Sequence, residues 1–139
     1  MILIDTTPLV ALCDPRDSLH KRAVADLDRV GRRPLTACAP VLTEACFLLD
    51  RPVQRARLSR LLSELHVAAL PIDGDVAVRG RVFAWLARYA EHEPDWADGL
   101  QVVACSIEAR AKVWTYDDEF RTTWRREDGS KVPLAFNAR

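Results

Sequence analysis

Short, continuous apolar runs alternate with segments of helical periodicity along this chain, and this alternation restricts the possible folds most strongly. Apolar runs of this length are typical of strands buried on both faces of a parallel sheet. Right-handed crossovers then place helices on both faces. We therefore predict an α/β fold: a three-layer α/β/α sandwich with a central, mainly parallel sheet. The expected strands lie at residues 2–4, 35–39, 67–72 and 113–116, with a last edge strand at 132–136.

Capping and proline signals bound the helices expected between these strands. Thr7 followed by Pro8 is a capping hydroxyl before a proline at the first helical position, and Gly31 suits a helix C-cap. No repeat, low-complexity tract or long linker divides the sequence, so residues 1–139 are expected to form a single domain. The other expected helices span residues 17–30, 40–49, 52–65, 73–89, 94–109 and 118–124.

The composition is that of a soluble globular protein, with 49% apolar and 29% charged residues. No apolar run reaches the roughly 18 residues that a membrane span requires, and the first residues lack the basic leader of a signal peptide. The cytoplasm is therefore the expected compartment. The formal net charge is zero, with 20 basic and 20 acidic residues, which counts against a nucleic-acid binder. If several carboxylates gather at one site, however, the remaining surface is relatively basic.

Four carboxylates stand where an α/β fold binds its ligands. In such folds the ligand site lies beyond the carboxyl ends of the strands, where the strand order reverses. Asp5 follows the first expected strand, Asp117 follows the fourth, and Asp98 stands near a helix start. Glu44 interrupts the apolar stretch 41–49, where an unpaired carboxylate is costly. Bound cations would remove this cost, so the four acids predict a metal site.

The types of residue at this predicted site indicate which metal and which reaction to expect. Oxygen ligands favour Mg²⁺ or Mn²⁺ over Zn²⁺, and the four cysteines and three histidines show no zinc-site spacing. Hard cations activate water and neutralise charge on a phosphoryl group, and two of them about 3.5–4 Å apart clamp the attacking and leaving oxygens. The acids therefore indicate hydrolysis of phosphodiester bonds, with either one or two cations.

Each acid also has a simpler explanation. Asp95 could cap a helix in which the helix dipole favours Asp98. Residues 117–119 could cap the short helix that follows them, and Asp5 could cap a turn. Glu44 is the hardest to explain without a ligand, because it would need either a buried partner or an exposed helix face.

Four motifs, in order along the chain, resemble the PIN-domain family, of the kind found in VapC toxins of bacterial toxin–antitoxin pairs. Residues 2–9 are similar to the family's opening strand and first metal-binding aspartate, and residues 41–45 to its helix-borne glutamate. Residues 95–100 resemble its third acidic motif, and residues 113–120 its final strand and fourth acid. The resemblance covers nearly the whole chain. One departure is Gly99, where many relatives carry a small residue such as alanine.

The resemblance implies roles for individual residues. Thr6 and Thr115 are expected as supporting hydroxyls. Asp117 and Asp118 are adjacent, and the spacing of Thr115 and Asp117 favours Asp117 as the fourth acid, with a contact from Asp118 left open. The implied catalytic acids, all of them metal ligands, are Asp5, Glu44, Asp98 and Asp117, with Asp95 as a further ligand.

The resemblance also implies an activity and partners. The chain would be an Mg²⁺- or Mn²⁺-dependent endoribonuclease that hydrolyses RNA, the toxin of a toxin–antitoxin pair, a homodimer, and a target of inhibition by a cognate antitoxin. Candidates for contact with RNA phosphates are Arg51, Arg55 and Arg121. For any one of these arginines, a solvated helix face is the simpler explanation.

Three alternatives compete with this interpretation. A phosphatase with Asp5 as nucleophile would need a second acid where the chain has Thr7, and a late lysine for which Lys112 is a poor match. A PIN-like RNA- or protein-binding module without catalysis is opposed by the intact set of acids. A DNA-directed nuclease would use the same metal chemistry, and the compact length favours RNA only weakly.

Overall fold

The computed structural model describes residues 1–137, and its centre is a sheet of four parallel strands. The strand order is β3-β2-β1-β4, so the chain moves one way along the sheet from β1 to β3 and then crosses back to β4. The predicted parallel α/β sheet is confirmed. The strands are β1 (Ile2–Ile4), β2 (Leu35–Ala37), β3 (Ala68–Ala69) and β4 (Lys112–Trp114).

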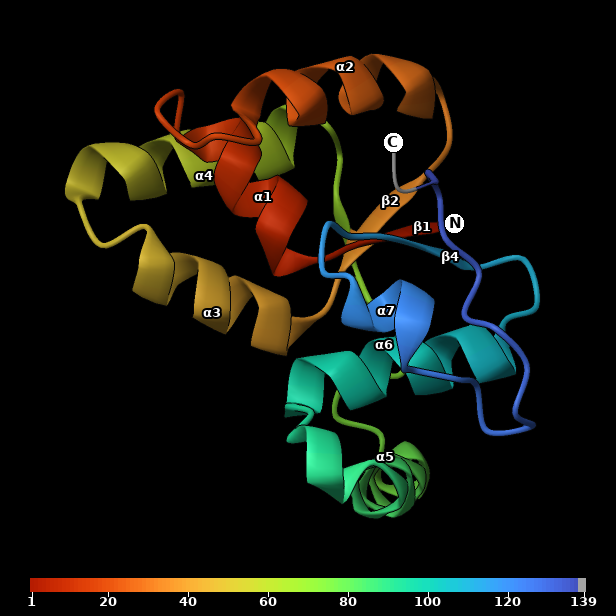
Figure 1. The fold of residues 1–139 in the computed structure, drawn as a ribbon. Helices are drawn as coiled ribbons and strands as arrows, with labels where there is room; N and C mark the ends of the chain where they lie inside the picture. The colour runs from red at the N-terminus through yellow and green to blue at the C-terminus, as the bar shows by residue number, and fades with distance from the viewer. Residues whose placement is uncertain (138–139) are drawn as a thin grey trace.

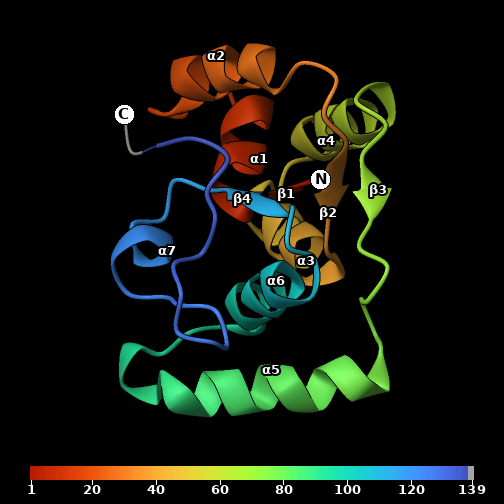
Figure 2. The same ribbon diagram turned by 90° about the vertical axis from the view of Figure 1, so that its right-hand side faces the viewer.

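Helices cover both faces of this sheet, as right-handed crossovers require. Helices α1, α2 and α4 lie on one side of the strands, and α5 and α6 lie on the other (Figures 1 and 2). Helix α3 contacts both α1 and α6, so it joins the two helical layers. The helices are α1 (Thr6–Cys13), α2 (His20–Val30), α3 (Ala39–Leu48), α4 (Pro52–Glu64), α5 (Val76–Arg88), α6 (Trp96–Ile107) and α7 (Glu119–Thr122), with a 3₁₀ turn at Ala90–His92.

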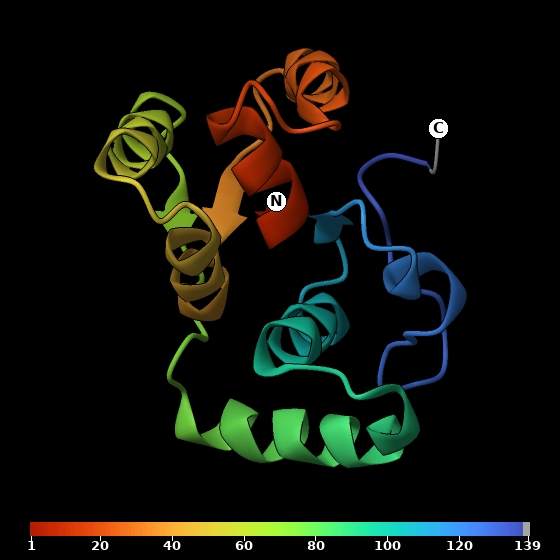
Figure 3. The same ribbon diagram turned by 60° about the vertical axis from the view of Figure 1, so that its left-hand side comes forward.

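The central position of β1 decides where ligands can bind. β1 pairs with β2 on one side and with β4 on the other, and its three residues are all buried. Helix α1, which follows β1, and helix α7, which follows β4, lie on opposite sides of the sheet (Figure 1). The edge at the carboxyl ends of these two strands is therefore the expected ligand site. Figure 3 shows the strands arranged side by side from β3 to β4, with α6 below β4. Among residues 1–137, no helix is long and apolar enough to cross a membrane.

Several predicted boundaries differ from the structure; the strand expected at 67–72, for example, is confined to Ala68–Ala69. The expected edge strand at 132–136 is reduced to an isolated parallel bridge between Leu134 and Val113. This segment follows β4 in the chain but runs parallel to it, and only one residue pair comes into register. Helix α1 begins at Thr6 rather than at Pro8, because proline is tolerated within the first helical turn. This earlier start puts Asp5 at the N-cap position, where its side chain makes no capping hydrogen bond.

Gly99 lies where α6 packs against α5. A Cβ atom at this position would lie 2.9 Å from Cγ1 of Val82, 3.2 Å from Cε3 of Trp85 and 3.3 Å from Cδ2 of Leu86. Val82 and Trp85 are buried, and the branched Val82 side chain has little rotational freedom. The glycine that departs from the family pattern therefore permits close approach of two helices.

We expect Gly99→Ala to destabilise the protein by about 1 kcal/mol, because overpacking at the α5–α6 contact outweighs the higher helix propensity of alanine. Urea unfolding followed by circular dichroism measures the change. Gly80→Ala is the matched control. Gly80 lies on the exposed face of α5, where an added Cβ would meet no atom within 4 Å. This substitution should therefore stabilise the protein by about 1 kcal/mol through the higher helix propensity of alanine. Equal stabilisation by the two substitutions would show that Gly99 is not a packing requirement.

Candidate active site

Asp5 is the centre of the candidate site, at the carboxyl end of β1. Its side chain is only 6% exposed, and both of its oxygens accept hydrogen bonds from other parts of the fold. Gln101 Nε2 on α6 donates to Oδ1 at 3.0 Å, and Thr115 Oγ1 after β4 donates to Oδ2 at 2.7 Å. Burial nevertheless raises the pKa of Asp5, because these two bonds offset only part of the desolvation. The carboxylate is therefore held in a fixed position, while no cationic side chain among residues 1–137 pairs with it.

The residues after β4 bring a second acid beside Asp5. The backbone N–H of Asp117 donates to Thr115 Oγ1 at 3.0 Å, so the same hydroxyl binds both parts of the site. Asp117 Oδ1 accepts from the N–H of Glu119 at the start of α7. The next acid, Asp118, has a side chain 79% exposed and pairs with Arg121 at 3.1 Å. Of the two adjacent aspartates, Asp117 is thus the one whose negative charge acts on Asp5.

Asp95 and Asp98 form a reciprocal cap at the start of α6. The N–H of Asp98 donates to Asp95 Oδ1 at 2.8 Å, and the N–H of Asp95 donates to Asp98 Oδ2 at 3.1 Å. Burial, followed by the negative charges of Asp95 and Asp5, raises the pKa of Asp98 to about 8. The capping role suggested by the sequence is therefore real. Capping alone does not explain why several acids gather at the start of α6, because a helix cap needs only one carboxylate.

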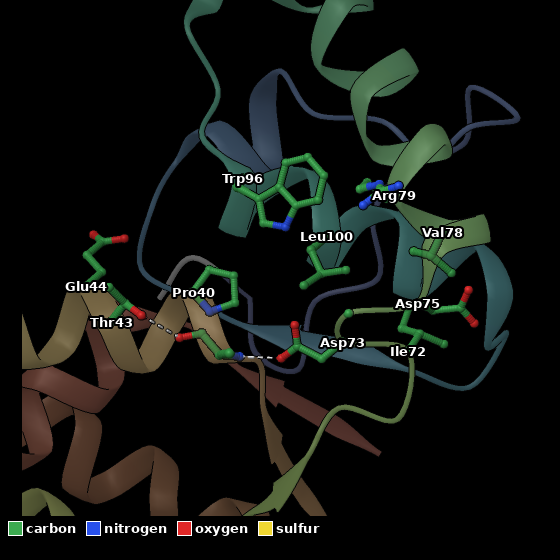
Figure 4. Close-up of a pocket in the computed structure, with 12 residues that line it drawn as sticks. Pro40, Thr43, Glu44, Ile72, Asp73, Asp75, Val78, Arg79, Trp96 and Leu100 are labelled. Atoms are coloured by element: carbon green, nitrogen blue, oxygen red, sulfur yellow. Dashed lines mark hydrogen bonds between the residues drawn. The ribbon is translucent and has the colours of Figure 1, made fainter.

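Glu44 approaches the same group of acids from α3. It lies on the partly buried side of the helix, four residues after Pro40 (Figure 4). Burial, followed by the charges of Asp95, Asp5 and Asp117, raises its pKa. The four acids expected from the sequence thus come from four separate elements and act electrostatically on one another.

The chemistry of this group suits a hard cation, although the side chains are not closed around one. Within residues 1–137, no three acidic, histidine or cysteine side chains stand close enough together to hold a metal ion. The oxygen donors nevertheless match Mg²⁺ or Mn²⁺. Two buried side-chain oxygens have no hydrogen-bond partner within the described residues. They are Oγ1 of Thr6, which follows Asp5 in the chain, and Oε1 of Gln101, whose Nε2 donates to Asp5. A hydrated cation would offer a partner both to these oxygens and to the carboxylates.

Gln101 is a site residue that the sequence interpretation missed. Its side chain is 1% exposed, and its Nε2 donates to Ala97 O at 3.2 Å as well as to Asp5. The signal was present in the sequence: Gln101 is a polar residue in an otherwise apolar stretch, residues 99–105, which is the same feature that singled out Glu44. It also stands one helical turn after Asp98, so both side chains lie on the same face of α6.

The three arginines expected to contact RNA occupy different environments. Arg55 donates to the carbonyl oxygens of Cys46 and Leu49, which gives its guanidinium a role at the C-terminal end of α3. Arg51 precedes α4 and lines a cavity of about 350 Å³ together with residues of the α1–α2 loop. Arg121 lies beside the acids and lines a small cavity with Thr115 and Asp117. Contact with RNA stays a prediction for all three.

Comparison with known proteins shows the family and the fold of the chain. A family model described as "PIN domain" matches residues 2–124. The crystal structure of the toxin VapC20 from Mycobacterium tuberculosis, described as cleaving the sarcin-ricin loop, superposes with a TM-score of 0.70. The alignment covers 87% of this chain and 93% of that one, at 21% sequence identity, and shows a shared fold. No curated protein sequence matches the chain. The chain belongs to the PIN-domain family.

Proposed function

We propose that this protein is a metal-dependent endoribonuclease that hydrolyses phosphodiester bonds of RNA. The observation that supports this proposal best is the group of acids around Asp5, at the carboxyl edge of a parallel sheet, whose pKa values are raised by burial and then by one another's charges. Mutual repulsion of this kind costs stability, and a divalent cation would remove the cost. The residues that would hold Mg²⁺ or Mn²⁺ are Asp5, Glu44, Asp98 and Asp117, with Asp95 as a further ligand.

Each acid has a distinct task in this proposal. Asp5 is the fixed ligand, because Gln101 and Thr115 hold both of its oxygens. Asp98 is oriented by its bond with the backbone of Asp95, and Glu44, on a longer and partly exposed side chain, would reach the cation from α3. The cation would activate a water molecule and neutralise charge on the phosphate.

The substrate and partners are proposed from the toxin whose fold this chain shares. VapC20 is described as a toxin that cleaves the sarcin-ricin loop, and we propose RNA as the substrate and a cognate antitoxin as the inhibitor here as well, in the cytoplasm. Large apolar side chains on α3 and α5 support a homodimer, because they would otherwise face solvent. Those with the greatest exposure are Phe47 at 80%, Val76 at 68% and Phe83 at 59%.

Cleavage of a mixed RNA substrate by the purified protein tests the proposed activity. We expect cleavage in Mg²⁺ or Mn²⁺ and none in excess EDTA, with activity restored when the cation is added back. A parallel assay with the monoester para-nitrophenyl phosphate tests for a general phosphatase and should give no turnover. Cleavage that persists unchanged in EDTA would contradict the proposed mechanism.

We expect Gln101→Leu to lower the rate of RNA cleavage about 10- to 100-fold, the usual effect of removing a partner that orients a metal ligand. Leucine fills a similar volume but leaves Asp5 Oδ1 without its donor, so the carboxylate loses its fixed orientation. Measurements of kcat across a Mg²⁺ titration should show weaker apparent cation affinity. Ser106→Ala, on the same helix but bonded to Val102 O and the Glu127 N–H, is the control. Equal rates for Gln101→Leu and wild type would exclude an orienting role.

A further inference from the structure

A cavity of about 590 Å³ adjoins the candidate active site on the side of Glu44. Its walls come from the start of α3, the loop at residues 72–75, and the facing sides of α5 and α6 (Figure 4). Glu44 belongs both to this wall and to the group of acids, so whatever fills the cavity lies next to the proposed cation. The volume is in the range of about 300–1,000 Å³ that is typical of small-molecule sites.

Trp96, at the start of α6, supplies an aromatic wall of this cavity. One side of its indole contacts Phe83 edge-on, with ring centroids 4.9 Å apart. Its ring faces the space between Pro40 and Arg79 (Figure 4). Trp96 is only partly buried, whereas the other three tryptophans of the chain are 2% exposed or less. Of the four tryptophans, Trp96 is therefore the one that presents an exposed aromatic surface next to the acids.

The charged side chains of the cavity wall differ in whether they already bond to other groups of the protein. Asp73 accepts a hydrogen bond from the N–H of Ala39, and Asp75 caps α5 by accepting from Ala77. The guanidinium of Arg79, by contrast, makes no hydrogen bond or ion pair to any other residue in the described part of the chain. Among residues 1–137, it is the one cationic side chain that lines the cavity. A ligand with hydrogen-bond acceptors would satisfy it.

We propose that this cavity binds an unpaired nucleobase of the RNA, next to the phosphate that is cleaved; this rests on the proposed ribonuclease function. Recognition of single-stranded RNA relies on bases that stack on aromatic side chains and accept hydrogen bonds at their edges. Trp96 provides the stacking surface and Arg79 the donors. A base seated between them directs its adjoining phosphate towards Glu44 and the other acids, so the cavity selects unpaired segments for cleavage.

Two substitutions test the cavity without depending on the acids. We expect Trp96→Leu to raise the KM for a short single-stranded RNA about 10-fold or more, since base–aromatic stacking contributes strongly to binding, while kcat changes little. Trp96→Phe should recover most of the loss. Arg79→Gln, on a different helix, should also raise KM about 10-fold. Arg81→Gln is the matched control, because Arg81 is also on α5 but bonds to Glu127 and lies outside the cavity wall, and it should behave as wild type.

Tryptophan fluorescence tests the same cavity without turnover. In Asp98→Asn protein with EDTA, we expect the single-stranded RNA to quench the emission of Trp96, and a double-stranded RNA of the same sequence to quench it less. The signal should disappear when Trp96→Phe is added, because the remaining tryptophans are buried. Quenching without cleavage in the wild type would contradict the nuclease function and leave the base site intact. An unchanged KM in both Trp96→Leu and Arg79→Gln would overturn the base site. A change in oligomeric state that occurs in Trp96→Leu and not in Arg79→Gln would also overturn it.

Discussion

Replacing Asp98 with asparagine is expected to lower the rate of RNA cleavage by more than about 100-fold, because loss of even an outer partner of a metal ligand costs 10- to 100-fold. Asparagine keeps the shape of the side chain and can still accept the Asp95 N–H at the helix cap, so the fold should be retained. The measurements are kcat/KM in saturating Mg²⁺ and the circular dichroism spectrum of the same preparation.

The neighbouring acids supply the controls for this result. Asp5→Asn and Glu44→Gln should lose cleavage to a comparable extent. Asp118→Asn removes an exposed carboxylate that pairs with Arg121. Because exposed ion pairs contribute little free energy, this variant should retain cleavage activity within about threefold of wild type. Full activity in Asp98→Asn, or an equal loss in Asp118→Asn, would contradict the assignment of the acids.

The second large effect is a fall in the stability of the metal-free protein as pH rises. In the unfolded chain, aspartates and glutamates titrate near pH 4. Folding raises the pKa of Asp98 to about 8 through burial and the charges of Asp95 and Asp5, and raises those of Asp5 and Glu44 mainly through burial. Between pH 4 and pH 8 the folded state therefore binds more protons than the unfolded state. The stability present below pH 4 is lost progressively as pH rises through this range.

Thermal unfolding in EDTA measures this effect. We expect Tm to be about 5 °C lower at pH 8 than at pH 5, and saturating Mn²⁺ to reverse the difference at pH 8. Since the cation competes with protons for the same carboxylates, its apparent affinity should increase towards pH 8. Asp98→Asn should flatten the pH dependence and raise the Tm of the metal-free protein at pH 8. A Tm that increases from pH 5 to pH 8 in EDTA would show that folding does not raise the pKa values of these acids.

The sheet and the acids were predictable from the sequence because each has a local signal. The apolar run at β1 ends in Asp5, so this acid was expected at the carboxyl end of a buried strand. Glu44 was conspicuous as a charge in an apolar helix. The acids could then be grouped because parallel strands bring their carboxyl ends to one edge.

Other features depend on contacts between distant segments, and no local pattern encodes them. Gln101 lies 96 residues from Asp5 in the chain, and its hydrogen bond exists only after α6 packs against the sheet. In the sequence Gly99 was only a departure from the family pattern, whereas its role is set by Val82 and Trp85 on α5. The base cavity likewise requires α3, α5 and α6 together, so the exposure of Trp96 could not be read from the sequence.

The most direct test of the central claim is a titration of Mn²⁺ into metal-free protein, with cation binding measured by calorimetry and RNA cleavage measured in the same samples. The proposed site predicts that both signals rise over the same Mn²⁺ concentrations in wild type and in Asp118→Asn, and that both are lost in Asp98→Asn. Cleavage that proceeds before any cation binds, or cation binding that is undiminished in Asp98→Asn, would contradict a catalytic metal site formed by these acids.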